Sequence, residues 1–386
     1  MMKRKVLIRF LYVALAAMLL NACRGEMPVI QSEEEEVGKN PLGGEDIKGM
    51  FLLNEGNMGS NKCTLDFYDC TTGKYHRNIY AERNPSVVKE LGDVGNDLQI
   101  YGDKLYAVIN CSHFVEVMDV HTAQHLGKID VTNCRYMAFH KDKAYVSSYA
   151  GPVQIDPTAR PGKVVEIDTV SLAVTREVVV GYQPEEMVVV GDKLYVANSG
   201  GYRAPNYDRT VSVVDLNTFT VVKTIDVAIN LHRMAVDNHG NIYVSSRGDY
   251  KGQSSDVFVL NSETDRVTGS LGIAANEMCL NGDSLYMTSV ELNTVTGSNA
   301  IGYAIYDIAK KEIVSRNFIT DGTDKLIKIP YGVAINPETK DIYVTDAKNY
   351  VTPGTLYCFS PEGKKRWSIR TGDIPASFAF STKKFY

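Results

Sequence analysis

The sequence predicts an all-β fold, a seven-bladed β-propeller in which the C-terminal strand closes the N-terminal blade. A polar turn followed by an aliphatic residue and a tyrosine occurs six times after residue 100, at Tyr106, Tyr145, Tyr195, Tyr243, Tyr286 and Tyr343. Neighbouring tyrosines are 39 to 57 residues apart, and self-similarity at about 40 to 50 residues is typical of propeller blades. Beyond the N-terminal apolar run, no segment has the 3.6-residue apolar period of a helix.

The first element is a predicted signal peptide, residues 1–22. A basic start precedes an apolar run at 10–20, which is too short to span a bilayer because a spanning helix needs about 20 residues. The run ends in Leu20-Asn21-Ala22-Cys23, which resembles the lipobox of bacterial lipoproteins. Cys23 is therefore the predicted lipidation site, and we expect a protein held on the outer membrane by a lipid anchor. An ordinary signal peptide with an incidental cysteine is the alternative.

Residues 23–48 are predicted to be a lipidated, flexible, acidic tether. The segment has almost no periodic apolar pattern, and Ser32 is followed by four glutamates at 33–36. A serine and acidic run after a lipidated cysteine resembles the surface-export signal of Bacteroides-group lipoproteins, which implies that the protein faces the cell exterior. Without residues 1–22 the formal charge falls from -5 to -9. A net-acidic chain argues against a nucleic-acid partner.

Residues 49–386 are predicted to form the propeller, with four short strands in each blade. The copy around Tyr195 has β-rich runs at 185–190, 193–198, 210–215 and 221–227, separated by Gly-Asp and Asn-Thr turns. Before the first repeat, strands at 50–53, 65–68 and 75–79 lack an innermost partner, whereas an innermost-type strand at 376–380 has no blade after it. Pairing these two ends removes the exposed sheet edges.

Aligning the blades on these strands divides the loops between two faces of the propeller. The plain face has tight turns, and the varied face has loops that differ from blade to blade. The long connections between second and third strands lie at 54–64, 148–163, 198–209, 247–256, 291–300 and 346–354. Ordering long loops costs conformational entropy, so six on one face indicate a use. They mix tyrosine with Asn, Ser, Gly and Arg, which is typical of binding loops. Polar loops without a ligand are the alternative.

The connections between blades add an inner ring at the mouth of the central channel, with Arg135, Tyr136, Glu186, Arg233, Glu277 and Tyr331. A concave mouth that is both aromatic and polar is the usual place for a ligand, although each of these residues could instead make a structural contact. From the two sets of loops we predict the ligand-binding residues Asn110, Arg135, Tyr136, Tyr149, Tyr182, Asn198, Tyr202, Arg203, His232, Arg233, Arg247, Tyr331 and Asp346.

Catalytic signals are missing from the sequence, so we expect no enzyme, no metal site and no intrinsic cofactor. The seven histidines are too separated for a convincing metal set, and no GxSxG or P-loop string occurs. Quinone-cofactor propellers rely on repeated tryptophans, and this chain has one, Trp367. A metal-dependent hydrolase or lyase is the less favoured alternative. Cys111 and Cys134 are the one cysteine pair that the register puts on the same face, and a disulfide or two buried thiols are both open.

The repeat Val211-Ser-Val-Val-Asp215-Leu-Asn-Thr218 resembles the YncE or YVTN family of β-propellers. Two strings near the start, Phe51-Leu-Leu-Asn54-Glu55-Gly56-Asn57 and Leu91-Gly-Asp-Val-Gly-Asn96-Asp97, are similar to the BtuG-like surface lipoproteins of Bacteroidetes. That resemblance implies capture of cobalamin or another corrinoid, and its transfer to a TonB-dependent outer-membrane transporter. A surface scaffold or adhesion propeller that binds a protein or a glycan is the alternative.

Overall fold

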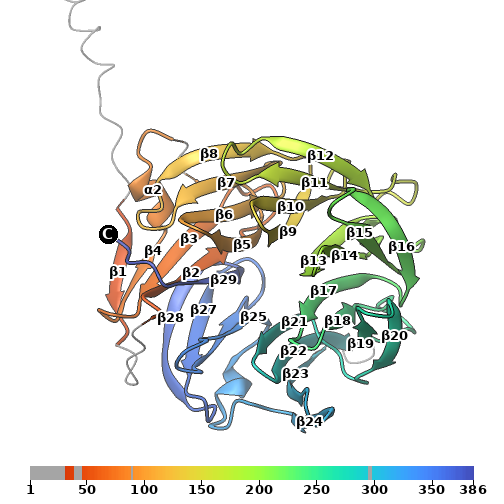
Figure 1. The fold of residues 1–386 in the computed structure, drawn as a ribbon. Coiled ribbons are helices and arrows are strands. Elements are labelled where there is room, and N and C mark those ends of the chain that lie inside the picture. The colour runs from red at the N-terminus through yellow and green to blue at the C-terminus, as the bar shows by residue number, and fades with distance from the viewer. Residues whose placement is uncertain (1–30, 39–45, 88–89, 294–297) are drawn as a thin grey trace, which may run out of the picture.

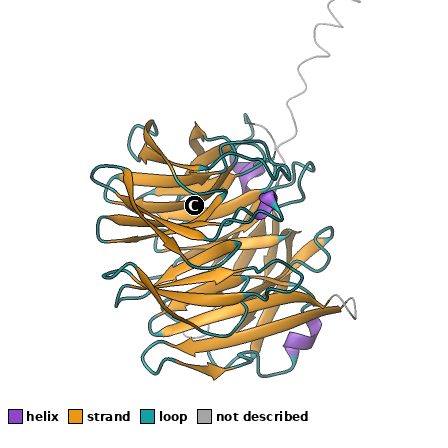
Figure 2. Ribbon diagram, turned by 90° about the vertical axis from the view of Figure 1, so that its right-hand side faces the viewer, coloured by secondary structure: helices purple, strands orange, loops and turns teal. Residues whose placement is uncertain are grey.

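In a computed structural model, the chain forms a ring of seven antiparallel sheets around a central channel (Figure 1). The structure describes residues 31–38, 46–87, 90–293 and 298–386. Viewed from the side, the strands run between two faces that carry the loops (Figure 2). The predicted fold, a seven-bladed all-β propeller, is confirmed.

Each blade after the first contains four strands in chain order from the channel outward. The second and third blades consist of β5 (Gly95–Tyr101), β6 (Lys104–Ile109), β7 (Phe114–Asp119) and β8 (His125–Asp130), then β9 (Cys134–His140), β10 (Lys143–Ser148), β11 (Lys163–Asp168) and β12 (Val174–Val179). The fourth and fifth consist of β13 (Pro184–Val190), β14 (Lys193–Asn198), β15 (Thr210–Asp215) and β16 (Thr220–Asp226), then β17 (Leu231–Val236), β18 (Asn241–Ser246), β19 (Asp256–Asn261) and β20 (Arg266–Ser270). The sixth and seventh consist of β21 (Glu277–Asn281), β22 (Ser284–Asn293), β23 (Ser298–Asp307) and β24 (Glu312–Ser315), then β25 (Pro330–Ile335), β26 (Ile342–Asp346), β27 (Pro353–Phe359) and β28 (Lys365–Asp373).

The first blade joins the two ends of the chain. It contains β2 (Gly49–Asn54), β3 (Thr64–Asp69) and β4 (Lys74–Arg77), and its innermost strand is β29 (Pro375–Ser381). β29 pairs with β2 from Gly49 opposite Ser381 to Asn54 opposite Pro375. The predicted closure of the ring by the C-terminal strand is therefore confirmed.

The repeated aliphatic-tyrosine pair joins each blade to both of its neighbours. In β14, Leu194 packs in the core cluster shared with the preceding blade, and Tyr195 packs with Ile242 and Val244 of the following blade. Successive side chains of a strand point to opposite faces of its sheet, so a two-residue motif reaches both interfaces. The repeat is a packing motif of the core.

The acidic run differs from the predicted tether. Residues 33–36 form β1 (Glu33–Glu36), which pairs with β4 as a fifth, outermost strand of the first blade. Glu34 lies 2.6 Å from Lys74 Nζ, and Arg77 pairs with both Glu33 and Glu35. Backbone pairing and opposite charge attach this segment to an edge strand. The signal peptide 1–22, Cys23, and tether residues 24–30 and 39–45 lie outside the described residues.

Three local features also differ from the sequence predictions. The strand expected at 75–79 ends at Arg77, and a short helix, α2 (Ile79–Arg83), follows and buries Tyr80 against the core. The long loop expected at 291–300 is largely an extension of the β22–β23 hairpin. Two further short helical turns are η1 (Gly201–Arg203) and η2 (Thr323–Leu326).

The two cysteines considered for a disulfide are free thiols. Cys134 is fully buried, and its thiol lies 3.5 Å from the carbonyl of Ile109 and 3.4 Å from that of Phe114. Cys111 sits at the turn after β6, where its thiol lies 3.5 Å from Asn110 Oδ1. The alternative of unlinked thiols therefore holds. Within the described ranges, no helix is long and apolar enough to cross a membrane.

Candidate functional site: the mouth of the channel

β-bulges at the start of the innermost strands place extra side chains at the channel. In β9, Cys134 pairs with Ser148 and Met137 with Val146, so Arg135 and Tyr136 lie opposite Ser147 alone. Such a bulge re-aims side chains at the end of a strand. The same register shift occurs before Met187 in β13, before Met234 in β17 and before Val333 in β25.

Hydroxyl groups of the second strands satisfy the displaced backbone of these bulges. The Tyr136 N–H donates to Ser147 Oγ at 3.1 Å, and the Arg233 N–H donates to Ser245 Oγ at 3.0 Å. In the seventh blade the Gly332 N–H donates to Thr345 Oγ1 at 2.7 Å. Because the freed donors keep partners, the bulges cost little of the ladder's stability.

The bulges and the varied-face loops enclose a cavity of about 630 Å³ at the mouth of the channel. Eight of the thirteen predicted binding residues line it: Arg135, Tyr136, Tyr149, Tyr202, His232, Arg233, Arg247 and Tyr331. Tyr207, Tyr250, Tyr350 and Glu277, which belong to the loops and ring expected there, also contribute. The structure therefore brings most of the predicted set to one place.

The other five predicted residues stay outside the lining. Asn110 donates to Asn133 Oδ1 and to the Cys134 carbonyl, and Asn198 donates to Ser212 Oγ. Asp346 accepts from the Ile329 N–H at 2.9 Å. These three side chains are buried and hold the loop ends together. The remaining two, Tyr182 and Arg203, stack on each other, with the guanidinium carbon 3.6 Å from the ring centre.

The predicted set lacked several lining residues, among them Glu55, Asn96 and Glu185. Glu55 and Asn96 stand in the two strings that carry the BtuG-like resemblance. Glu185 adjoins Glu186, which the sequence placed in the ring. Glu186 instead faces a second cavity of about 340 Å³ on the other side of Arg233.

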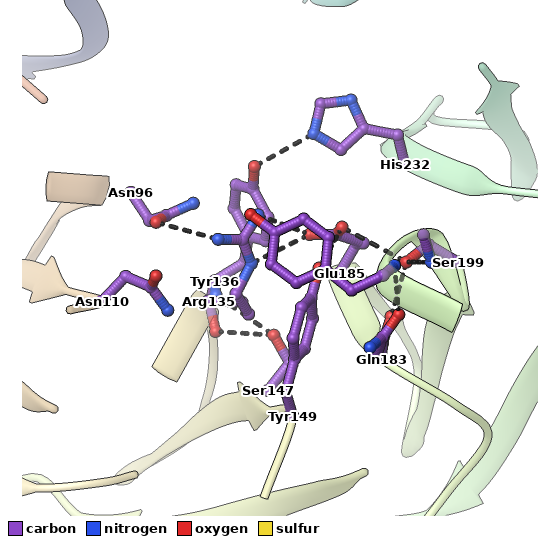
Figure 3. Close-up of polar contacts among 12 residues, drawn as sticks. Asn96, Asn110, Arg135, Tyr136, Ser147, Tyr149, Gln183, Glu185, Ser199 and His232 are labelled. Atoms are coloured by element: carbon purple, nitrogen blue, oxygen red, sulfur yellow. Dashed lines mark hydrogen bonds and ion pairs between the residues drawn. The ribbon is translucent and has the colours of Figure 1, made fainter. Parts of the chain in front are cut away.

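Glu185 is the hub of the polar contacts in the cavity wall (Figure 3). Its Oε2 accepts from Arg135 Nε at 3.1 Å and from Arg135 Nη2 at 3.0 Å. Its Oε1 accepts from the Tyr149 hydroxyl at 2.5 Å and lies 3.4 Å from Arg247 Nη1. The Ser199 hydroxyl lies 3.3 Å from the same oxygen and donates to the Gln183 carbonyl at 2.9 Å. Both carboxylate oxygens therefore have several donors.

The charges around this hub decide which groups are ionised. Burial acts to raise the pKa of Glu185, but Arg135 and Arg247 outweigh it and hold that pKa below its usual value. Burial, aided by the nearby arginines, keeps the pKa of His232 well below its usual value, so this imidazole is neutral. The Tyr136 hydroxyl lies 3.1 Å from His232 Nε2 (Figure 3).

A second set of carboxyl groups lines the mouth cavity and the second cavity next to it. Glu55 accepts from the Tyr331 hydroxyl at 2.9 Å, and burial raises the pKa of Glu55 to about 7. Burial also raises the pKa of Glu186 to about 8 and raises that of Glu277. Glu277 contacts Arg233 at 2.6 Å. This part of the channel therefore gains negative charge as the pH rises through neutrality.

Glu55 should make stability depend on pH. Its folded-state pKa of about 7 lies above the ordinary 4.5, so the protonated form is favoured in the fold, and this stabilisation is lost as pH rises from about 4.5 to 7. Relative to wild type, Glu55→Gln should therefore gain about 1–3 kcal/mol of unfolding free energy between pH 5 and pH 8. Urea unfolding at both pH values measures it. An equal difference at both values would show that Glu55 titrates normally.

A third cavity of about 520 Å³ adjoins the mouth between the loops of the fifth and sixth blades. Arg247, Tyr250, Asn276, Val290 and Tyr350 line both spaces. A ligand larger than the mouth itself could extend over this shared wall. Within the described ranges, no group of three or more His, Cys, Asp or Glu side chains is placed to hold a metal ion.

The comparisons with known proteins give a family whose activity is unassigned. The family described as Domain of unknown function (DUF5074) matches residues 48–380, which is nearly the whole propeller. The chain belongs to the DUF5074 family. No curated protein matches it.

Solved structures resemble this DUF5074 chain in fold only. A quinonprotein alcohol dehydrogenase-like protein from Bacteroides thetaiotaomicron is 15% identical, with a TM-score of 0.57 over 86% of this chain and 78% of that one. Kuenenia stuttgartiensis hydrazine synthase is 14% identical, with a TM-score of 0.55 over 69% of this chain and 77% of that one. At such identities the likeness supports a β-propeller and carries no function.

Proposed function

We propose that this DUF5074 propeller captures a corrinoid, such as cobalamin, in the mouth of its channel. The observation that carries the proposal is the cavity of about 630 Å³ lined by tyrosines, arginines and amides, with a further space of about 520 Å³ beside it. The rim of a corrinoid carries many amides, and its ring face is apolar. Tyrosine rings offer apolar contact, while Arg and Asn side chains bond to amide oxygens.

The rigidity of the site supports tight binding. Glu185 and Arg135 fix each other, and Tyr149 and Tyr202 pack edge to face with ring centres 5.8 Å apart. A ligand that meets a preformed wall loses less affinity to the ordering of side chains. The BtuG-like strings at 51–57 and 91–97 point to the same ligand class.

We further propose that the protein is lipid-anchored at Cys23 on the outer membrane, facing the cell exterior, and passes its ligand to a TonB-dependent transporter. Large apolar side chains at the tips of four varied-face loops support a protein partner on that face: Met58, Ile155, Tyr250 and Val351 are 65–75% exposed. Apolar patches with a polar border mark interaction sites, and these four loops share one face of the propeller. Co-purification of the tagged protein with such a transporter tests the partnership, and acyl labelling that Cys23→Ala abolishes tests the anchor.

Calorimetric titration of the purified protein with cyanocobalamin tests the ligand. We expect saturable binding and a rise in melting temperature, because a ligand that binds only the native state stabilises it. Tyr250→Ala should weaken binding about 5- to 30-fold, since aromatic anchors contribute strongly to binding sites. Tyr250 is 65% exposed, so its loss should leave the fold intact.

Tyr386→Ala is the matched control. Tyr386 is also 65% exposed, and its backbone bonds to His121 in the turn between β7 and β8, on the plain face. Cyanocobalamin affinity should be unchanged in this variant. Absence of both binding heat and a melting shift in the wild type would refute corrinoid capture. Retention of a glycan or a protein by the varied face would then favour the scaffold alternative.

A further inference from the structure

Arg247 differs from the other two arginines of the cavity in how little holds it. Arg135 makes two bonds to Glu185 and one to Asn96 Oδ1, and its guanidinium lies over the Tyr149 ring at 4.9 Å. Arg233 is paired with Glu277 at 2.6 Å. Among the described residues, the guanidinium of Arg247 has one polar contact, at 3.4 Å from Glu185 Oε1. Most of its five N–H donors are therefore unused.

The charge balance of the wall also leaves Arg247 without a full counterion. Arg135 and Arg247 share the single carboxylate of Glu185, and the Tyr149 hydroxyl already donates to the oxygen that faces Arg247. The wall around Glu185 therefore carries one positive charge in excess. An uncompensated guanidinium that is only 21% exposed favours an anion from outside the protein.

The loop that carries Arg247 has a well-defined backbone, with Tyr250 at its tip. Gly248 has φ of 63°, and a Cβ there would meet the Gln253 carbonyl oxygen at 2.0 Å, so only glycine allows this turn. Asp249 Oδ1 accepts from the N–H groups of residues 251, 252 and 253 at 2.8 to 2.9 Å. At the tip, Tyr250 has φ of 59°, an uncommon conformation for a bulky residue.

Space for a ligand is present beside the guanidinium. Arg247 and Tyr250 line both the mouth cavity and its neighbour. Gly201 faces them, and a Cβ on Gly201 would lie 3.9 Å from Arg247 Nη1 and 3.2 Å from Asn230 Oδ1. That Asn230 oxygen is buried and has no hydrogen-bond partner among the described residues. Asn230 also lines the mouth cavity, so this oxygen belongs to the wall next to the guanidinium.

We propose that Arg247 binds a phosphate or carboxylate group of the ligand, with the Tyr250 ring packed beside it. The proposal deepens the proposed function and rests on it: cobalamin carries one phosphodiester, in the nucleotide loop that hangs from the corrin ring. The corrin would occupy the mouth, and the phosphodiester would lie on the wall shared with the adjoining cavity.

The test compares cyanocobalamin with dicyanocobinamide, a corrinoid that lacks the nucleotide loop and its phosphodiester. Dissociation constants are measured for both ligands with wild type, Arg247→Gln and Arg247→Lys. We expect Arg247→Gln to weaken the binding of cyanocobalamin about 10- to 100-fold and that of dicyanocobinamide less than about 3-fold. The reason is that only cyanocobalamin has the phosphodiester whose charge-assisted bond to Arg247 would be lost. The cyanocobalamin affinity of Arg247→Lys should lie between those of wild type and Arg247→Gln, since lysine keeps the positive charge but lacks the two parallel N–H donors of a guanidinium.

Arg209→Gln is the control, because Arg209 is 57% exposed and pairs with Asp226. It should change neither affinity. Equal weakening of both corrinoids by Arg247→Gln would overturn the proposal, as would no effect on cyanocobalamin. If neither corrinoid binds the wild type, the proposed function fails, and inorganic pyrophosphate becomes the probe. A melting-temperature rise that Arg247→Gln abolishes would still support the anion site, and an identical response of both proteins would overturn it.

Discussion

Replacing Glu185 with alanine is expected to lower the free energy of unfolding by about 3–5 kcal/mol, the cost of breaking a buried ion pair by removing one partner. Glu185 is 1% exposed. The substitution would leave Arg135 without the acceptor of two bonds and would orphan the Tyr149 hydroxyl. Two neighbouring arginines would then repel each other in a poorly hydrated wall.

Chemical unfolding followed by circular dichroism measures this change. Glu185→Gln should lose less unfolding free energy than Glu185→Ala, because the amide oxygen still accepts hydrogen bonds. Glu177→Ala is the control. The Glu177 side chain is 52% exposed and pairs with Lys163 at the outer edge of the third blade, and exposed ion pairs contribute about 0–1 kcal/mol to stability. Similar losses for Glu185→Ala and Glu177→Ala would show that Glu185 does not organise the wall.

Removing residues 375–386 is expected to prevent formation of the closed ring. The deletion takes away β29, exposes the paired edge of β2 and strips Phe378, Phe380 and Phe385 from the clusters they pack against. An unpaired, largely buried strand is an aggregation site. We expect insoluble protein, or a soluble form that binds a hydrophobic dye and lacks a cooperative thermal transition.

A shorter deletion, after Ser381, separates ring closure from aromatic packing. It keeps β29 but removes Phe385, whose ring centre lies 4.3 Å from that of Phe67 and 5.7 Å from that of Phe51. Loss of this partly buried side chain should cost about 1–3 kcal/mol and leave a cooperative transition. A cooperative transition in the longer deletion as well would contradict the role of β29 in closure.

The blades could be predicted from the sequence because their determinants are local and repeated. Strands expected at 193–198 and 210–215 have those bounds in β14 and β15. The edge strand at 33–36 could not be predicted, because four consecutive glutamates have no apolar pattern. Their pairing depends on Lys74 and Arg77, which reach them only after the first blade has formed.

The sequence predicts on which face of the propeller the candidate site lies better than it predicts which residues line it. Arg135, His232 and Arg233 follow blade connections, so the register alone places them near the mouth. Asn110, Asn198 and Asp346 stand where second strands end on the same face, but their side chains bond within the loop bases. Polar residues at strand ends are needed both for ligands and for loop hydrogen bonds, and one sequence does not separate the two uses.

The sequence by itself determined the seven-bladed ring, its closure, and which face carries the long loops, since each follows from a two-residue strand period repeated in every blade. Only the tertiary structure decided which side chains meet at the mouth. Bulges in β9, β13 and β17 shift the strand register there, so Glu185 faces Arg135 and Arg247 in the mouth cavity while Glu186 faces the second cavity. That choice depends on contacts between blades about 50 residues apart, such as Arg135 with Glu185, which no local pattern encodes.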